Sequence, residues 1–177
     1  DEALVLEKAP KSIAIVGAGA VGGEFADVFS AFGSKVTLIE VMPQILPLED
    51  ADAGVEVARS FKKRGIDVMA GAKLTAAKIG KSKVALTVEA GGAKNAIEAD
   101  VVLVATGRAA NTENIGLKEA GAAHTHRGCS KSNERMETSA RGYYAIGDVA
   151  GPPMLAHKGE REGMIVAEVI AGAHFHP

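Results

Sequence analysis

A glycine-rich turn directly after an apolar run constrains this chain more than any other stretch of its sequence. Residues 13–16 are apolar, and residues 24–32 carry apolar side chains at helical spacing. Between them stand Gly17, Gly19 and Gly22. A buried strand, a tight turn and a helix in this order form the loop that binds a dinucleotide's phosphates. Gly17 would permit the sharp turn, Gly19 would let a pyrophosphate approach the backbone, and Gly22 would let the helix pack on the strand.

The start of the expected helix is part of the predicted phosphate site. The first N–H groups of a helix have no acceptor within the helix, and that end carries a partial positive charge. A bound anion would therefore accept hydrogen bonds from the backbone at Ala20 and Val21. The alternative is a glycine turn that serves packing alone.

An acidic residue at the end of the next expected strand indicates which dinucleotide is bound. Residues 35–40 predict this strand, and Glu40 stands about 18 residues past Gly22. A carboxylate there would accept hydrogen bonds from both adenosine ribose hydroxyls and would repel a 2′-phosphate. Val41 and Met42 follow, not arginines, so the sequence favours NAD over NADP. In the alternative interpretation Glu40 is merely exposed.

Composition limits the classes of protein to consider. The 177 residues are 47% hydrophobic and 24% charged, which predicts a globular chain. A net charge of −2 without a basic block argues against a nucleic-acid partner, and no apolar run reaches membrane-spanning length. A single cysteine, Cys129, excludes an internal disulfide and predicts a reducing setting, the cytoplasm or the mitochondrial matrix. The start at Asp1, without a Met or a signal-peptide pattern, predicts a piece of a longer protein.

The order of the expected elements predicts an α/β fold, with a Rossmann-like parallel sheet and an antiparallel β-meander. The periodicities and the turn residues predict a linker over 1–11, a β-α-β unit over 12–40 and a proline-punctuated loop over 42–47. A helix over 51–64, capped by Asp50 or Asp52, and a strand over 66–69 are expected to follow. The last elements of this part are a meander of three short strands within 72–99 and a central parallel strand over 101–105. Ligands of such sheets bind at the carboxyl ends of strands, so Thr106–Arg108 is a second candidate place for a ligand.

The composition changes after Asn111. The sequence predicts a short helix over 114–121, a turn at Arg127–Gly128, a short strand over 143–146 and a final helix over 155–170. The pairs His124/His126 and His174/His176 offer only two ligands each, whereas a structural zinc site needs four, so no metal site is predicted.

Five motifs along the chain match one enzyme family. The chain resembles the flavin-dependent pyridine nucleotide-disulfide oxidoreductases, and within them the dihydrolipoamide dehydrogenase branch. The motifs are Gly17–Glu24, Met42–Pro47, Ala105–Arg108 with Asn111 and Thr112, Thr138 with Tyr144–Asp148, and Met154–Lys158 with Glu162 and Gly163. The resemblance implies an NAD-binding domain over 1–111, followed by an incomplete FAD-domain segment over 112–177.

The resemblance also implies an activity for the parent enzyme, which passes electrons from dihydrolipoamide through a disulfide and FAD to NAD. The family's N-terminal FAD half with its Cys-x4-Cys, and its C-terminal dimer-interface domain, have no counterpart here. His176–Pro177 is interpreted as a linker or a truncation scar. We therefore expect an inactive isolated chain whose partners are the rest of a homodimeric enzyme. The alternatives are a reductase of the NADH peroxidase or mercuric reductase type, and a stand-alone nucleotide-binding module.

By the same resemblance, further residues touch the cofactors. Glu24 would face the nicotinamide side, Gly107 would let the backbone approach NAD, and Asp148 would accept hydrogen bonds from the ribityl hydroxyls of FAD. A helix N-terminus would lie near the pyrimidine edge of the flavin, formed by Leu155, Ala156 and His157. The alternatives are an exposed helix-start acid at Glu24, an ordinary turn at Gly107, a capping or turn aspartate at Asp148 and a capping or exposed histidine at His157.

Overall fold

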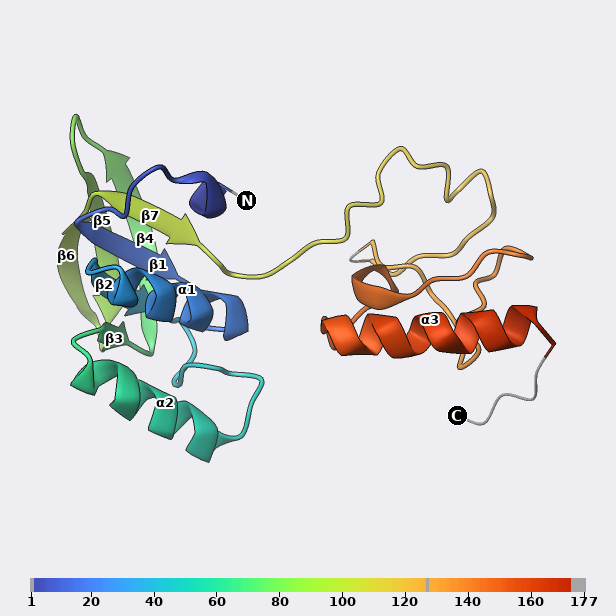
Figure 1. Cartoon of the computed structure of the whole chain (residues 1–177). Coiled ribbons are helices and arrows are strands. Elements are labelled where there is room, and N and C mark those ends of the chain that lie inside the picture. The colour runs from blue at the N-terminus through green and yellow to red at the C-terminus, as the bar shows by residue number, and fades with distance from the viewer. Residues whose placement is uncertain (1, 127, 173–177) are drawn as a thin grey trace. The chain divides into compact units, whose positions relative to one another are not determined.

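The computed structural model describes residues 2–126 and 128–172. The chain divides into two compact units, Asp1–Gly107 and Arg108–Pro177 (Figure 1). The functional boundary after residue 111 stays a prediction. No helix within the described residues is long and apolar enough to cross a membrane.

The first unit contains a parallel sheet and a separate antiparallel sheet (Figure 1). The parallel strands, in the order β3-β2-β1-β7, are β1 (Ser12–Val16), β2 (Lys35–Ile39), β3 (Asp67–Met69) and β7 (Val101–Val104). The antiparallel strands are β4 (Ala72–Ile79), β5 (Val84–Ala90) and β6 (Ala93–Ala99). The helices are the 3₁₀ turn η1 (Glu2–Val5), α1 (Ala20–Ala31) and α2 (Ala51–Lys63). The predicted Rossmann-like sheet and meander are therefore confirmed.

Side chains on the two faces of the parallel sheet build two separate cores. On β1, Ile13 and Ile15 pack with Phe29 of α1 and Phe61 of α2, whereas Ala14 faces the opposite way. The second core joins this opposite face to the antiparallel sheet and contains Ala14, Ile39, Ala72, Leu86, Val88 and Ala99. Strands that are buried on both faces must be apolar at successive positions, which explains the unbroken apolar runs of the sequence.

The prediction of a central strand over 101–105 is wrong in its position. β7 is parallel, as expected, but it pairs only with β1 and lies at an edge of the described sheet. Val101 and Leu103 pack into one core and Val102 into the other. Residues 101–103 are apolar because both faces of the strand are packed there, although the strand has only one neighbour, whereas Val104 is 67% exposed.

The described residues of the second unit contain one long helix, α3 (Ala156–Ile170), as predicted, together with the 3₁₀ turn η2 (Gly147–Ala150). Residues 114–121 form turns, so the predicted short helix is wrong. Asn114 and Gly116 have φ angles of 60° and 78°, which a right-handed helix cannot contain. The predicted strand over 143–146 is reduced to a single bridge, between Glu137 and Tyr144.

The predicted ends of the two helices in the first unit are confirmed. Gly33 and Gly65 end α1 and α2 with φ angles of 86° and 81°. Asp50 occupies the cap position of α2, although its side chain makes no capping hydrogen bond. Gly128 donates its N–H to the oxygen of Thr125 at 3.0 Å, which confirms a turn there, while Arg127 lies outside the described residues.

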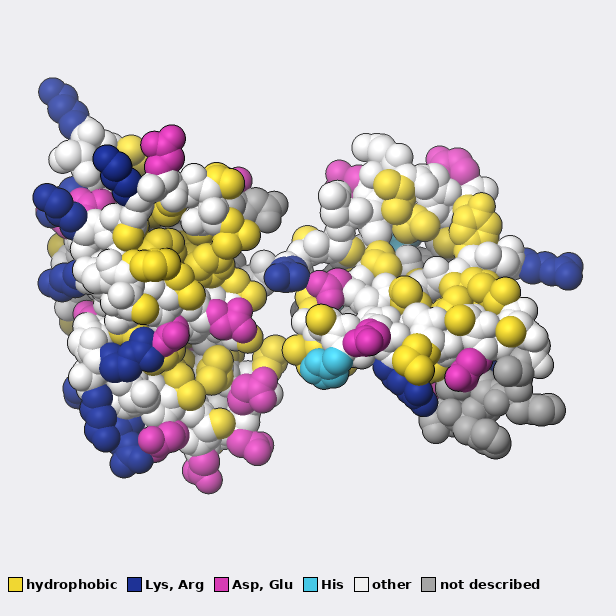
Figure 2. Space-filling view, in the orientation of Figure 1, with side chains coloured by type: hydrophobic (Ala, Val, Ile, Leu, Met, Phe, Trp, Pro, Cys, Tyr) yellow, Lys and Arg dark blue, Asp and Glu magenta, His cyan; other side chains and the backbone are white. Residues whose placement is uncertain are grey.

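Apolar side chains also reach the surface of both units (Figure 2). In the second unit the exposed large apolar side chains include Ile115, Tyr143, Ile146, Leu155, Met164 and Ile170. The buried apolar side chains of this unit are mostly small, namely Ala122, Cys129, Ala140, Ala145 and Val169. The described part of this unit therefore has a much smaller core than the first.

Candidate functional site

The glycine turn lies where the strand order of the parallel sheet reverses. The chain progresses from β1 through β2 to β3 on one side, and then returns to place β7 on the other side of β1. The loops after β1 and β7 therefore leave the sheet side by side, and Ala105 donates its N–H to the oxygen of Val16 at 2.7 Å. In open α/β sheets, this reversal point is where ligands bind.

The three glycines of the turn meet different surroundings. A Cβ on Gly17 would lie 2.5 Å from the oxygen of Ala105, and a Cβ on Gly22 would lie 1.9 Å from the oxygen of Gly17. A side chain at either position would collide with the backbone. Gly19 has an ordinary φ of −69°, and no described atom would lie within 4 Å of a Cβ there. Packing explains two of the glycines, and the third leaves open space at the N-terminus of α1.

Glu40 is buried, at 6% exposure, so the interpretation as a merely exposed acid is wrong. Its Oε2 accepts the N–H of Ala18 at 2.7 Å, and its Oε1 accepts the N–H of Met42 at 2.8 Å. A carboxylate oxygen has two acceptor sites, so each remains able to accept one hydroxyl. The side chain thus joins the end of β2 to the glycine turn and cannot rotate away without losing both hydrogen bonds.

The loop over residues 42–47 completes the support of the turn. Leu46 donates its N–H to the oxygen of Ala18 at 2.7 Å, so both polar groups of Ala18 are held within the chain. Leu46 has a φ of 50°, a left-handed conformation that is uncommon for such a side chain and is often found at functional sites. Ile45 is buried and packs against Gly54 of α2, where a Cβ would lie 2.7 Å from its oxygen. The sequence marked this loop only as a family motif.

The other predicted residues of the first unit lie at the same edge of the sheet. Ala20 and Val21 form the first turn of α1, and Glu24 follows them, exposed, on the same helix. Gly107 follows β7 with a φ of 147°, where side chains are strained. The structure therefore brings the glycine turn, Glu40 and the loop after β7 together, each at the carboxyl end of a strand.

In the second unit, Asp148 lies in η2 and pairs with Arg108, whose Nη1 is 3.0 Å from Oδ2 of the carboxylate. Both side chains are at least half exposed, at 60% for Arg108 and 50% for Asp148. They line a hollow of about 410 Å³, together with Ala109, Ala110, Asn111, Val149 and Met154. The sequence marked both Asp148 and the Thr106–Arg108 stretch as candidate ligand positions, but it did not predict that Arg108 and Asp148 pair.

The N-terminus of α3 carries the remaining predicted residues. Leu155 caps the helix in an extended conformation, and its oxygen accepts the N–H of Lys158 at 3.1 Å. Ala156 and His157 form the first turn, and both are exposed.

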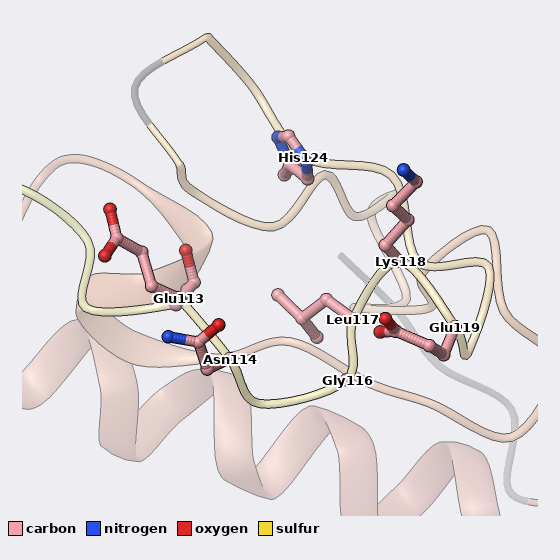
Figure 3. Close-up of a pocket in the computed structure, with 8 residues that line it drawn as sticks. Glu113, Asn114, Gly116, Leu117, Lys118, Glu119 and His124 are labelled. Carbon is pink, nitrogen blue, oxygen red and sulfur yellow. The ribbon is translucent and has the colours of Figure 1, made fainter.

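A second hollow, of about 610 Å³, lies in the second unit (Figure 3). Figure 3 shows Glu113 and Asn114 on one side of it, Lys118 and Glu119 on the other, and Leu117 between them. Its lining also includes His124, but the described residues contain no group of three or more His, Cys, Asp or Glu placed to hold a metal. His174 and His176 lie outside the described residues.

A family model described as pyridine nucleotide-disulphide oxidoreductase matches residues 1–163. The chain belongs to this family. The resemblance deduced from the five motifs is therefore confirmed. Members with similar sequences include a dihydrolipoyl dehydrogenase of Rhizobium etli, 43% identical over 99% of this chain, and one of Thermus scotoductus, 44% identical over 95%. The chain spans 37% of the length of each of these relatives.

Several solved structures share the fold of this family member. The HOCl-induced flavoprotein disulfide reductase RclA of Escherichia coli matches with a TM-score of 0.87 and 30% identity, over 98% of this chain and 39% of that protein. LpdA of Mycobacterium tuberculosis matches with a TM-score of 0.86 and 28% identity, over 97% of this chain and 37% of that protein. The predicted α/β fold class is confirmed by these neighbours.

Proposed function

We propose that this chain is the NAD-binding part, and half of the FAD-binding part, of a dihydrolipoamide dehydrogenase. The observation that carries the proposal is the contrast within the glycine turn. At Gly17 and Gly22 the chain's own backbone occupies the space that a Cβ would need, whereas this space is open at Gly19, beside the N-terminus of α1. A pyrophosphate fits this space because the helix start offers unpaired N–H groups and positive partial charge.

The preference for NAD rests on the anchored carboxylate of Glu40. Two backbone N–H groups fix its position, and its remaining acceptor sites suit the two adenosine ribose hydroxyls. A 2′-phosphate placed there would bring its negative charge against a buried carboxylate that cannot move aside. NADP is therefore expected to bind more weakly than NAD.

The flavin side of the proposal rests on the second unit. Asp148 would accept hydrogen bonds from the ribityl hydroxyls of FAD, and Leu155, Ala156 and His157 would present the helix N-terminus to its pyrimidine edge. Glu24 and Gly107 would place the nicotinamide end of NAD. The cofactors supply hydride and electron transfer, and these residues supply position and charge.

The remainder of the enzyme is the proposed partner of this chain. Relatives are nearly three times as long, since the chain spans 37% of their length. Exposed apolar side chains on the second unit, among them Tyr143, Met164 and Ile170, are the kind of surface that further protein would cover (Figure 2). We expect the complete enzyme to be a homodimer with a redox-active cysteine pair outside this chain, and the isolated chain to be inactive.

A second candidate is a disulfide reductase with another substrate. The likeness to RclA, at 30% identity over nearly the whole chain, favours this alternative over a stand-alone nucleotide-binding module. The first candidate is preferred because the dihydrolipoyl dehydrogenases of Rhizobium etli, Thermus scotoductus and Mycobacterium bovis are each more than 40% identical over nearly all of this chain.

Calorimetric titration of the purified chain with NAD, NADP and FAD tests the nucleotide part of the proposal. NAD is expected to bind more tightly than NADP, and equal affinity would contradict the role given to Glu40. An assay with dihydrolipoamide and NAD tests the rest, because turnover by the isolated chain would show that it contains the whole catalytic machinery.

A further inference from the structure

The Gly147 backbone, directly before Asp148, is held on both sides by one pair of charged side chains from α3. The N–H of Gly147 donates to Oε2 of Glu162 at 2.7 Å, and Nζ of Lys158 donates to the oxygen of Gly147 at 3.1 Å. The two side chains also pair with each other, with 2.8 Å between Nζ of Lys158 and Oε1 of Glu162. We call Lys158 and Glu162 the α3 clamp.

The clamp is more buried than the other ion pairs of the described chain. Its side chains are 17% and 13% exposed, against 64% and 62% for the Arg59–Glu56 pair of α2. The helix also comes close to the turn, because a Cβ on Gly159 would lie 3.3 Å from the Cα of Gly147. Hydrogen bonds to charged groups contribute more when they are shielded from water, so this contact fixes Gly147 firmly.

The placement of the clamp is not the one that stabilises a helix best. Lys158 stands in the first turn, where the helix dipole disfavours a positive charge. The order Lys158 before Glu162 is also the less favourable one for a pair at this spacing. This placement instead lets both side chains form hydrogen bonds with the backbone of Gly147. The φ of 70° at Gly147 sets the direction in which the chain enters Asp148.

We propose that Lys158 and Glu162 are positioning residues that aim the Asp148 carboxylate at the ribityl chain of a flavin. This inference rests on the flavin contact assigned to Asp148 under the proposed function. The clamp fixes the backbone that leads into Asp148, and Arg108 holds Oδ2 of its carboxylate at 3.0 Å. Arg108 occupies one acceptor site on Oδ2, and the remaining acceptor sites of the two carboxylate oxygens can accept the hydroxyls.

The test measures two properties of each variant in the complete gene product, its affinity for FAD and its thermal unfolding. The fluorescence of free FAD reports the affinity. Lys158→Met and Glu162→Ala are each expected to weaken FAD binding about tenfold. Lys158→Arg, which keeps the positive charge, should keep most of the affinity of the natural chain. The double variant should bind FAD no more than slightly worse than either single variant, because both side chains act on one residue. Amide exchange at Gly147 should become faster in both single variants without FAD. Glu160→Gln, which removes a charge from the exposed side of the same helix, is the matched control.

The outcomes separate this inference from the proposed function. If the clamp variants lower the melting temperature but bind FAD as the Glu160→Gln control does, the clamp is structural and the inference is wrong. If Asp148→Asn also leaves FAD affinity unchanged, the flavin contact of Asp148 fails instead. Should Glu162→Ala not fold, Lys158→Met carries the test, because it removes the hydrogen bond to the Gly147 oxygen, and unchanged FAD affinity in this variant would overturn the inference.

Discussion

Individual glycines of the turn have separable roles, and one substitution distinguishes binding from folding. Gly19→Ala is expected to lower the melting temperature only slightly, because its φ of −69° suits alanine and the added Cβ meets no described atom, although alanine is a weaker N-cap than glycine. The same Cβ would occupy the proposed path of the pyrophosphate. NAD affinity should therefore fall by about tenfold, or about 1.4 kcal/mol, in a calorimetric titration.

Gly22→Ala is the contrasting control for this substitution. Its Cβ would lie 1.9 Å from the oxygen of Gly17, so the turn or the helix must move. We expect a loss of stability of about 3 kcal/mol or more in urea unfolding, at the upper end of the usual overpacking cost. Unchanged NAD affinity in Gly19→Ala would show that the open space at the turn does not hold the pyrophosphate.

Glu40 combines a structural and a proposed binding role, so its replacement should change both stability and cofactor preference. In Glu40→Gln an NH2 group replaces one of the two oxygens, so the N–H of either Ala18 or Met42 faces a donor and loses its acceptor. We expect a loss of about 1–3 kcal/mol in urea unfolding. The ratio of NAD to NADP affinity should fall as well, because the repelling charge is removed.

The matched control for Glu40→Gln is Glu49→Gln, an exposed carboxylate in the loop before α2. It should change neither unfolding nor nucleotide binding. A Glu40→Gln protein that is destabilised but keeps the same NAD-to-NADP ratio would leave Glu40 with its structural role alone.

At the scale of elements, a hydrogen-bonded pair joins the starts of β1 and β7. Asp100 accepts the N–H and the hydroxyl of Ser12 at 2.8 Å each, and donates its own N–H to the Ser12 hydroxyl at 3.0 Å. The Ser12 hydroxyl, and then its N–H, lower the pKa of Asp100 below its ordinary value. A lowered folded pKa means that the carboxylate stabilises the fold above the ordinary pKa, and that this stabilisation is lost as the pH falls through the lowered pKa.

Asp100→Asn is therefore expected to reduce the acid sensitivity of the first unit. Its melting temperature should be lower than that of the natural chain near neutral pH, and the difference should shrink as the pH falls below about 4. Thermal unfolding followed by circular dichroism across this range measures the effect. Asp67→Asn, at the start of β3, is the control, and an equal pH dependence of both variants would contradict the role of the Ser12 contact.

Elements with a local signal were predictable from the sequence, and elements defined by distant partners were not. The β-α-β unit over 12–40 follows from apolar periodicity and from glycines at its turns, all of which lie within the unit. The edge position of β7 depends on sheet order, which is a long-range property. Residues 143–146 are apolar like a strand, but a strand also needs a neighbour, and the described chain supplies only the bridge to Glu137.

The candidate site shows the same division. The glycines and Glu40 were predictable because a dinucleotide site requires those residue types at a fixed spacing. The hydrogen bonds of Glu40 with Ala18 and of Glu162 with Gly147 were not predictable, because each joins residues far apart in the sequence. The motifs marked Glu162 and Leu46 without indicating what they contact.

At the scale of the whole molecule, the two units differ in how much apolar surface they bury. Both apolar cores consist of residues between Ile13 and Ala105, and their members include Ile, Leu, Val and Phe. In the described part of the second unit the buried apolar side chains are four small residues and Val169. Since stabilisation grows with the apolar area removed from water, the units should differ in their ability to fold alone.

We therefore predict that a protein of residues 1–107 folds by itself and keeps the NAD affinity of the whole chain, because the glycine turn, Glu40 and Gly107 all lie within it. It should unfold in one cooperative transition, whereas residues 108–177 alone should show none. Differential scanning calorimetry and NAD titration of both pieces provide the measurement. A cooperative transition in the second piece would mean that its small core is enough for it to fold alone. It would also contradict the proposal that further protein covers its exposed apolar side chains. Loss of NAD binding by the first piece would place part of the nucleotide site beyond residue 107.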